Sequence, residues 1–100
     1  MEVTKNREGA KLTVSISGRL NTSTSPKLEA ILKDSLDGVQ DLVLDLANLE
    51  YISSAGLRVV LSAQKTMNKQ GSMKVLNVKP EVYEVFLMTG FVDFLDIEQS

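Results

Sequence analysis

The chain has 100 residues, 43% of them hydrophobic and 24% charged, and this composition predicts one folded domain over residues 1–100. Its formal net charge of −2 argues against direct nucleic-acid binding. Cysteine and histidine are both absent, which removes disulfides, thiolate chemistry and the commonest general base and metal ligand. No apolar run approaches the roughly 20 residues that span a bilayer. We therefore expect a cytoplasmic domain with no membrane insertion, no metal and no cofactor.

Two strands joined by a turn are predicted at the start of the chain. Residues 2–7 are mostly polar and indicate an edge strand, and residues 8–10 contain a glycine and form the turn. Apolar and polar side chains alternate over residues 11–17, which is typical of a strand with one buried face. Gly18 is expected to end this second strand. The two strands together predict a β-hairpin.

A first helix is predicted after a polar connector over residues 21–25. Pro26 suits the first turn of a helix, with Thr24 or Ser25 as its N-cap. The apolar residues that follow recur at helical spacing and form one stripe: Leu28, Ile31, Leu32 and Leu36. Gly38 is expected to close the helix.

The centre of the chain predicts a buried strand over residues 42–46, a loop over 47–50 and a second helix over about 57–70. Tyr51 is expected to be a partly buried aromatic that anchors the loop. Asp41 and Asp45 lie four residues apart, so both should point to one side of the strand as solvent-facing charges. Gly71 is placed to end the second helix in a left-handed C′ conformation.

The last third of the chain predicts a strand over residues 73–78, a helix from Pro80 that ends at Gly90, and an apolar segment over 91–97 that is a strand or a docked tail. The element order is therefore β-β-α-β-α-β-α-(β). This order predicts an α/β fold with a mixed four- to five-stranded sheet, right-handed crossovers and helices mainly on one face.

Few residues offer catalytic chemistry. A serine nucleophile would lack a histidine to activate it, so we expect no enzyme activity. Three methionines are interpreted as core fillers: Met67, Met73 and Met88. Three cations of the second helix are interpreted as a solvated face, with a partner-binding surface beside the serines as the alternative: Arg58, Lys65 and Lys69.

Ser53 and Ser54 stand where a strand passes into the second helix. The first N–H groups of a helix lack intrahelical acceptors, so one hydroxyl can serve as an N-cap. A helix N-terminus also tolerates a phosphate well, because its free N–H groups and dipole favour negative charge. From the residues alone, an N-cap and a regulatory phosphoacceptor both remain open.

Several motifs resemble those of the STAS domain, and more narrowly of the bacterial anti-sigma factor antagonists. The central motif is Leu42-Val43-Leu44-Asp45-Leu46 followed by Leu49-x-Tyr51-Ile52-Ser53-Ser54-Ala55-Gly56-Leu57. Ser17-Gly18-Arg19-Leu20 is similar to the G-x-L that precedes the family's first helix. Asn77-Val78-Lys79-Pro80-Glu81-Val82 and Thr89-Gly90-Phe91 are similar to its closing helix.

The resemblance implies a binding module with a phosphorylation switch. Family members bind an anti-sigma factor with serine kinase activity and so release the sigma factor. Phosphorylation of one serine ends the interaction, and a PP2C-type phosphatase restores it. Anchoring the family's D-S-[ST]-G-L on Gly56 and Leu57 puts the acceptor at Ser54. Ser53 then takes the aspartate position and is the rival acceptor.

The resemblance also implies where the partner binds. The loop after G-x-L belongs to the family's partner-binding edge, and Asn21 stands where many members have an acid. The expected partner-binding residues are Asn21, Thr22, Ser53, Ser54, Ala55, Gly56 and Arg58. Two alternatives are a STAS adaptor without a switch, in a stressosome-like or lipid-transport assembly, and a small-molecule or nucleotide sensor.

Overall fold

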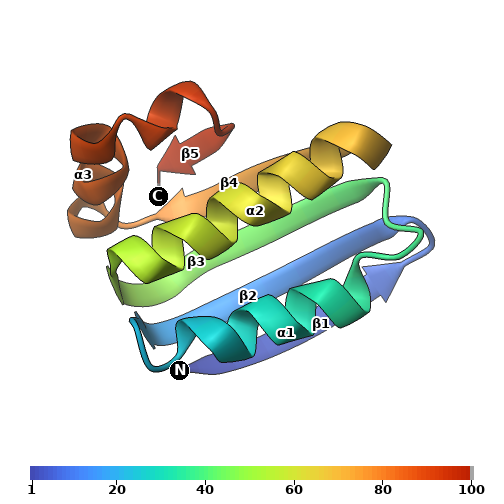
Figure 1. Cartoon of the computed structure of the whole chain (residues 1–100), viewed down its shortest axis with the longest axis horizontal. Coiled ribbons are helices and arrows are strands. Elements are labelled where there is room, and N and C mark those ends of the chain that lie inside the picture. Colours follow the sequence, from blue (N-terminus) through green and yellow to red (C-terminus); the bar gives the residue numbers. More distant parts are fainter. Residues whose placement is uncertain (100) are drawn as a thin grey trace.

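One mixed sheet runs through the molecule in the computed structural model, which describes residues 1–99 (Figure 1). Its strands, in spatial as well as chain order, are β1 Glu2–Glu8, β2 Lys11–Leu20, β3 Asp41–Ile52, β4 Ser72–Val78 and β5 Ile97–Gln99. The β1–β2 pair is antiparallel, and the other three pairs are parallel. The predicted α/β class, the mixed sheet and the N-terminal hairpin are confirmed.

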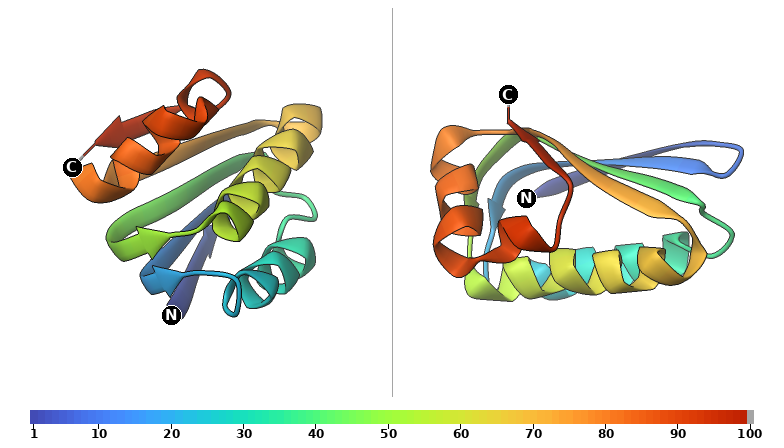
Figure 2. Two further views of the ribbon diagram at one scale, coloured as in Figure 1. Left: turned by 60° about the vertical axis from the view of Figure 1, so that its left-hand side comes forward. Right: turned by 90° about the horizontal axis from the view of Figure 1, so that it is seen from above.

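Two long helices cover one face of the sheet: α1 Ser25–Ser35 and α2 Ser54–Gln70. Figure 2 shows both lying beneath the curved sheet, while the third helix, α3 Pro80–Thr89, stands across one end. Helices mainly on one face were predicted, and this arrangement confirms it. No helix within residues 1–99 is long and apolar enough to cross a membrane.

The core lies between the sheet and the two long helices and extends under α3 at one end. Alternate residues of β2 are buried, because successive strand side chains point to opposite faces. The fully enclosed side chains include Val14, Ile16, Leu20, Leu28, Leu42, Leu44, Leu46, Met67 and Phe86. The opposite face of β2 keeps half-buried Thr13, Ser15 and Ser17. This face carries no helix, which explains its polar side chains.

Both central strands are longer than predicted. Gly18 does not end β2; it adopts φ 84° at a register shift, and β2 continues to Leu20. The predicted loop over residues 47–50 is also wrong, because β3 continues through it to Ile52. Leu49 is fully buried there and pairs with Gly18. A β-bulge adds an extra residue to one strand and so interrupts the alternation of apolar and polar residues. A strand that contains a bulge is therefore easily mistaken for a loop in the sequence.

The end of α2 differs from the prediction at Gly71. Its φ of 174° is extended rather than left-handed. Glycine is needed here for a different reason: a Cβ would lie 1.8 Å from the carbonyl oxygen of Gln40. Position 71 therefore requires glycine because its backbone lies so close to that of Gln40, and not because of a left-handed turn.

The C-terminal third agrees with the prediction except at one methionine. Helix α3 begins at Pro80 and ends at Gly90, whose φ of 77° is left-handed. The apolar segment that follows forms a short 3-10 helix, η1 Phe91–Asp93, and then β5. Met67 and Met73 are buried as predicted, but Met88 is 80% exposed, so its assignment to the core was wrong.

Candidate functional site

Helices α1 and α2 both begin at one end of the molecule, next to the carboxyl ends of β2 and β3 (Figures 1 and 2). Leu20 and Ile52 form the last register pair of these two parallel strands. The backbone N–H of Ser53 then donates to the carbonyl oxygen of Leu20 at 2.9 Å. This bond fixes the residue before α2 to the end of the neighbouring strand, so the loop at Asn21 and the serines lie side by side.

Ser53 is the N-cap of α2. Its backbone is extended (φ −96°, ψ 174°), and its hydroxyl oxygen accepts the N–H of Gly56 at 3.2 Å. Its carbonyl oxygen accepts the N–H of Leu57 at 2.9 Å, the first bond of the helix. The N-cap interpretation is therefore confirmed, and it applies to Ser53.

Ser54 is the first residue of α2 and has a different environment. Its side chain is exposed, and its hydroxyl makes no hydrogen bond within the described residues. The N–H groups of Ser54 and Ala55 are among those at the start of a helix that lack an intrahelical acceptor. An oxyanion on Ser54 would therefore meet the positive end of the helix dipole.

Gly56 brings α2 close to the strand ends. A Cβ on this residue would lie 2.8 Å from Cγ of Leu20 and 2.9 Å from Cγ1 of Ile52. No ordinary Cβ contact is that short, so only glycine permits this separation between helix and sheet. The glycine thus sets the depth at which the two serines sit.

The loop between β2 and α1 is held by Asn21. Its side-chain oxygen accepts the N–H groups of Ser23 and Thr24 at 3.0 and 3.1 Å. Thr24, predicted as one possible N-cap, does occupy the N-cap position of α1, but its hydroxyl donates to the carbonyl of Arg19 at 2.9 Å and makes no capping hydrogen bond. Thr22 is exposed at the tip of the loop. The amide of Asn21 is thus a structural part of the loop.

The predicted partner-binding residues lie on two adjoining segments. Asn21 and Thr22 belong to the loop, and Ser53, Ser54, Ala55 and Gly56 belong to the start of α2. The register of β2 and β3 brings these segments together. Arg58 lies one helical turn further along α2 and is exposed.

A stacked pair escaped the sequence reasoning. The guanidinium carbon of Arg19 lies 4.4 Å from the ring centroid of Tyr51. These residues are register partners, and Tyr51 is 40% exposed within β3 rather than anchoring a loop. Both residues lie beyond the bulges of β2 and β3. The sequence could have indicated this contact only if residues 18–20 and 47–52 had been predicted as strand.

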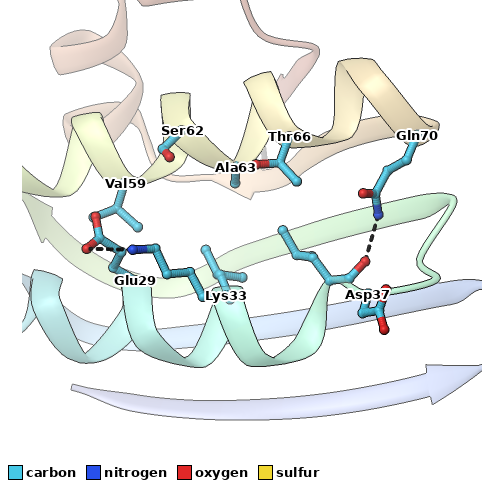
Figure 3. Close-up of a pocket in the computed structure, with 10 residues that line it drawn as sticks. Glu29, Lys33, Asp37, Val59, Ser62, Ala63, Thr66 and Gln70 are labelled. Carbon is cyan, nitrogen blue, oxygen red and sulfur yellow. Dashed lines mark hydrogen bonds and ion pairs between the residues drawn. The ribbon is translucent and has the colours of Figure 1, made fainter.

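A groove of about 280 Å³ lies between α1 and α2 (Figure 3). Leu32, Leu36, Val59 and Ala63 contribute its apolar lining. One end is closed where the Gln70 amide donates to the carbonyls of Leu36 and Val39, both at 2.6 Å. The wall on α1 carries an exposed pair in which Lys33 Nζ lies 4.0 Å from Glu29 Oε1. The groove is separate from the two serines.

Comparisons with known proteins agree on one family. The STAS domain model matches residues 2–100. A Bordetella bronchiseptica protein named anti-sigma factor antagonist BtrV is 38% identical over 102 residues, covering 100% of this chain and 88% of that protein. An anti-sigma factor antagonist structure from Mycobacterium paratuberculosis has a TM-score of 0.89 at 22% identity, covering 99% of this chain and 86% of that one. Bacillus SpoIIAA in its phosphorylated form has a TM-score of 0.76 at 16% identity, covering 99% and 93%.

Proposed function

The chain belongs to the STAS domain family, and we propose that it is an anti-sigma factor antagonist of the cytoplasm that is switched by phosphorylation of Ser54. In its unphosphorylated form it binds an anti-sigma factor with serine kinase activity, and the sigma factor is released. Phosphorylation by that kinase ends the interaction, and a PP2C-type phosphatase restores it. The domain itself is a binding module and performs no catalysis.

The difference between the two serines carries this proposal. The Ser53 hydroxyl is engaged with the Gly56 N–H, whereas the Ser54 hydroxyl is exposed and makes no hydrogen bond within residues 1–99. A kinase needs an accessible hydroxyl that can leave its surroundings and enter an active site. To enter a kinase active site, the Ser53 hydroxyl would first have to leave the Gly56 N–H that it accepts. These points favour Ser54 over Ser53 as the acceptor.

A phosphate on Ser54 is compatible with the fold. The helix dipole and the N–H groups of the first turn favour negative charge, so α2 should persist. The phosphate adds close to two negative charges at an exposed point. Binding a partner at this end of α2 would then require removing water from the phosphate and placing its charge in the interface, which weakens binding. Phosphorylated SpoIIAA, which shares this fold, supports the view that the fold accommodates the modification.

The test begins with the protein as it exists in its host. Copurification followed by intact-mass measurement identifies the bound anti-sigma factor and any phosphate. The purified kinase and ATP are then applied to wild type, Ser54→Ala and Ser53→Asn. Asparagine is a good N-cap without a hydroxyl, so Ser53→Asn should still gain one phosphate, whereas Ser54→Ala should gain none.

Binding completes the test. Ser54→Ala should bind the anti-sigma factor as wild type does, and Ser54→Asp should bind weakly. Equal affinities of these two variants for the anti-sigma factor would contradict a phosphorylation switch at Ser54. Failure of phosphate transfer to wild type would favour an adaptor without a switch. A thermal shift caused by a nucleotide or metabolite would instead support the sensor alternative.

A further inference from the structure

One side of α2 carries positive charge and no negative charge. The charged residues of Ser54–Gln70 are Arg58, Lys65 and Lys69, and all three are exposed. The helix contains neither aspartate nor glutamate, although the chain as a whole has a net charge of −2. Helix α2 therefore has a net positive charge within an acidic protein.

These cations lie in line with Ser54. An α-helix advances about 100° per residue, so five residues fall within an arc of roughly 80°. We call them the basic stripe: Ser54, Arg58, Ser62, Lys65 and Lys69, all exposed. The stripe is about 22 Å long, at 1.5 Å per residue. Ser62, at one border of the stripe, also lines the groove beside α1, together with Val59, Ala63, Thr66 and Gln70 (Figure 3).

The charges of the stripe are not neutralised within the described residues. Across residues 1–99 the ion pair is Lys33–Glu29, which joins two residues of α1. None of the three cationic groups of the stripe forms an ion pair or a hydrogen bond there. Acids lie to either side of α2: Glu29 and Asp37 line the groove, and Asp93 and Asp96 line a hollow with Gln64 and Asn68. The stripe therefore presents three unpaired cations in one row.

We propose that the basic stripe docks an acidic protein face, and that phosphorylation of Ser54 acts by cancelling the charge of this stripe. The identity of the partner as the anti-sigma factor rests on the proposed function. Charge complementarity determines the kind of partner, because a row of unpaired cations favours a row of carboxylates. Three cations on a chain of net charge −2 are too few to favour a nucleic acid.

The regulation follows from the position of Ser54 at the head of the stripe. Arg58 is four residues further along, so the two side chains are neighbours on the helix surface. A phosphate at the earlier position and an arginine at the later one is the favourable orientation of such a pair. The stripe then changes from three positive charges to about one. The modified serine both repels the partner and withdraws Arg58 from it.

Two double variants with identical charge change test the stripe. Lys65→Gln/Lys69→Gln removes two charges from it. Lys11→Gln/Lys74→Gln removes two exposed charges from strands whose neighbouring residues Leu12, Met73 and Val75 face the core, so it alters the face without helices. Poly-L-glutamate is titrated into each labelled protein, and amide chemical shifts are followed. Wild type and the control should shift along residues 54–69, and the stripe variant should not.

The same variants are then measured against the anti-sigma factor recovered by copurification. The stripe variant should bind roughly tenfold more weakly at low salt, with the difference shrinking as salt rises, and the control should match wild type. Equal binding by the two double variants would overturn the proposal. Poly-L-glutamate shifts outside residues 54–69, or tighter binding of a duplex DNA than of poly-L-glutamate, would also overturn it. If Ser54→Asp binds normally while the stripe variant is weak, the switch fails and the docking surface stands.

Discussion

The Ser53 hydroxyl accepts the backbone N–H of Gly56 across 3.2 Å, so the serine that closes the first turn of α2 stands directly before the exposed serine. Adjacent residues of the same type therefore have separate tasks. One holds the helix in place, and the other offers its hydroxyl to solvent. Substitutions should separate stability from surface chemistry at these two positions.

The first prediction concerns the free energy of unfolding of the two serine variants. Ser53→Ala should destabilise the domain by about 1 kcal/mol, because it removes the acceptor for the Gly56 N–H. Ser54→Ala should stay within about 0.5 kcal/mol of wild type, since its hydroxyl is exposed. Urea unfolding measures both. Ser53→Asn, which keeps a capping acceptor, should recover most of the loss. A larger loss for Ser54→Ala than for Ser53→Ala would contradict this account.

The second prediction ranks three glycine-to-alanine variants. Gly71→Ala should cost most, about 3 kcal/mol or more, because its Cβ would strike the backbone of Gln40 at 1.8 Å. Gly56→Ala should cost about 1–3 kcal/mol, since the Leu20 and Ile52 side chains can yield partly. Gly9→Ala meets no atom within 4 Å and should cost only about 1–2 kcal/mol for its positive φ. Thermal or urea unfolding that placed Gly9→Ala above Gly71→Ala would refute the ranking.

The third prediction compares two apolar residues of α3. Phe86 is fully buried, so Phe86→Ala should destabilise the domain by about 3–5 kcal/mol through lost burial and a cavity. Met88 is 80% exposed, so Met88→Ala should change stability by less than about 0.5 kcal/mol. Urea unfolding measures the difference in stability between the two variants, from their midpoints when the dependence of the free energy on urea is the same. Similar losses for the two variants would mean that α3 packs in another orientation.

The fourth prediction concerns the stacked pair at the strand ends. A double-mutant cycle with Arg19→Ala and Tyr51→Ala should give a coupling free energy of about 0.5–1 kcal/mol, as expected for an exposed cation–π contact. Tyr51→Phe keeps the aromatic ring and should retain most of the coupling. Additive losses in the cycle would show that the ring and the guanidinium do not interact in solution.

Hydrophobic periodicity was sufficient to predict the helices and the order of helices and strands along the chain. Leu28, Ile31 and Leu32 mark α1 by their spacing, and prolines mark the starts of α1 and α3. These signals are local, so a single sequence contains them. The same patterns placed Ser53 and Ser54 where a strand passes into the second helix, and the resemblance to STAS domains then favoured Ser54 as the acceptor.

The errors arose where contacts between distant segments decide the structure. Gly18 and the residues 47–50 looked like strand ends because bulges break the alternation on which a strand is recognised. Gly71 is explained by the approach of Gln40, and no local pattern reports that contact. The assignment of the cap to Ser53 rather than Ser54 depended on where α2 begins, and helix boundaries are set by such backbone geometry.

Strand β1 has a consequence for how the domain meets other proteins. It forms one border of the sheet, and its seven residues include four charged side chains: Glu2, Lys5, Arg7 and Glu8. A border with this much charge discourages another chain from adding a strand to it, which is a common route to aggregation. This protection suits the proposed exchange of partners, because the unpaired backbone of the edge strand then contributes little to binding other proteins.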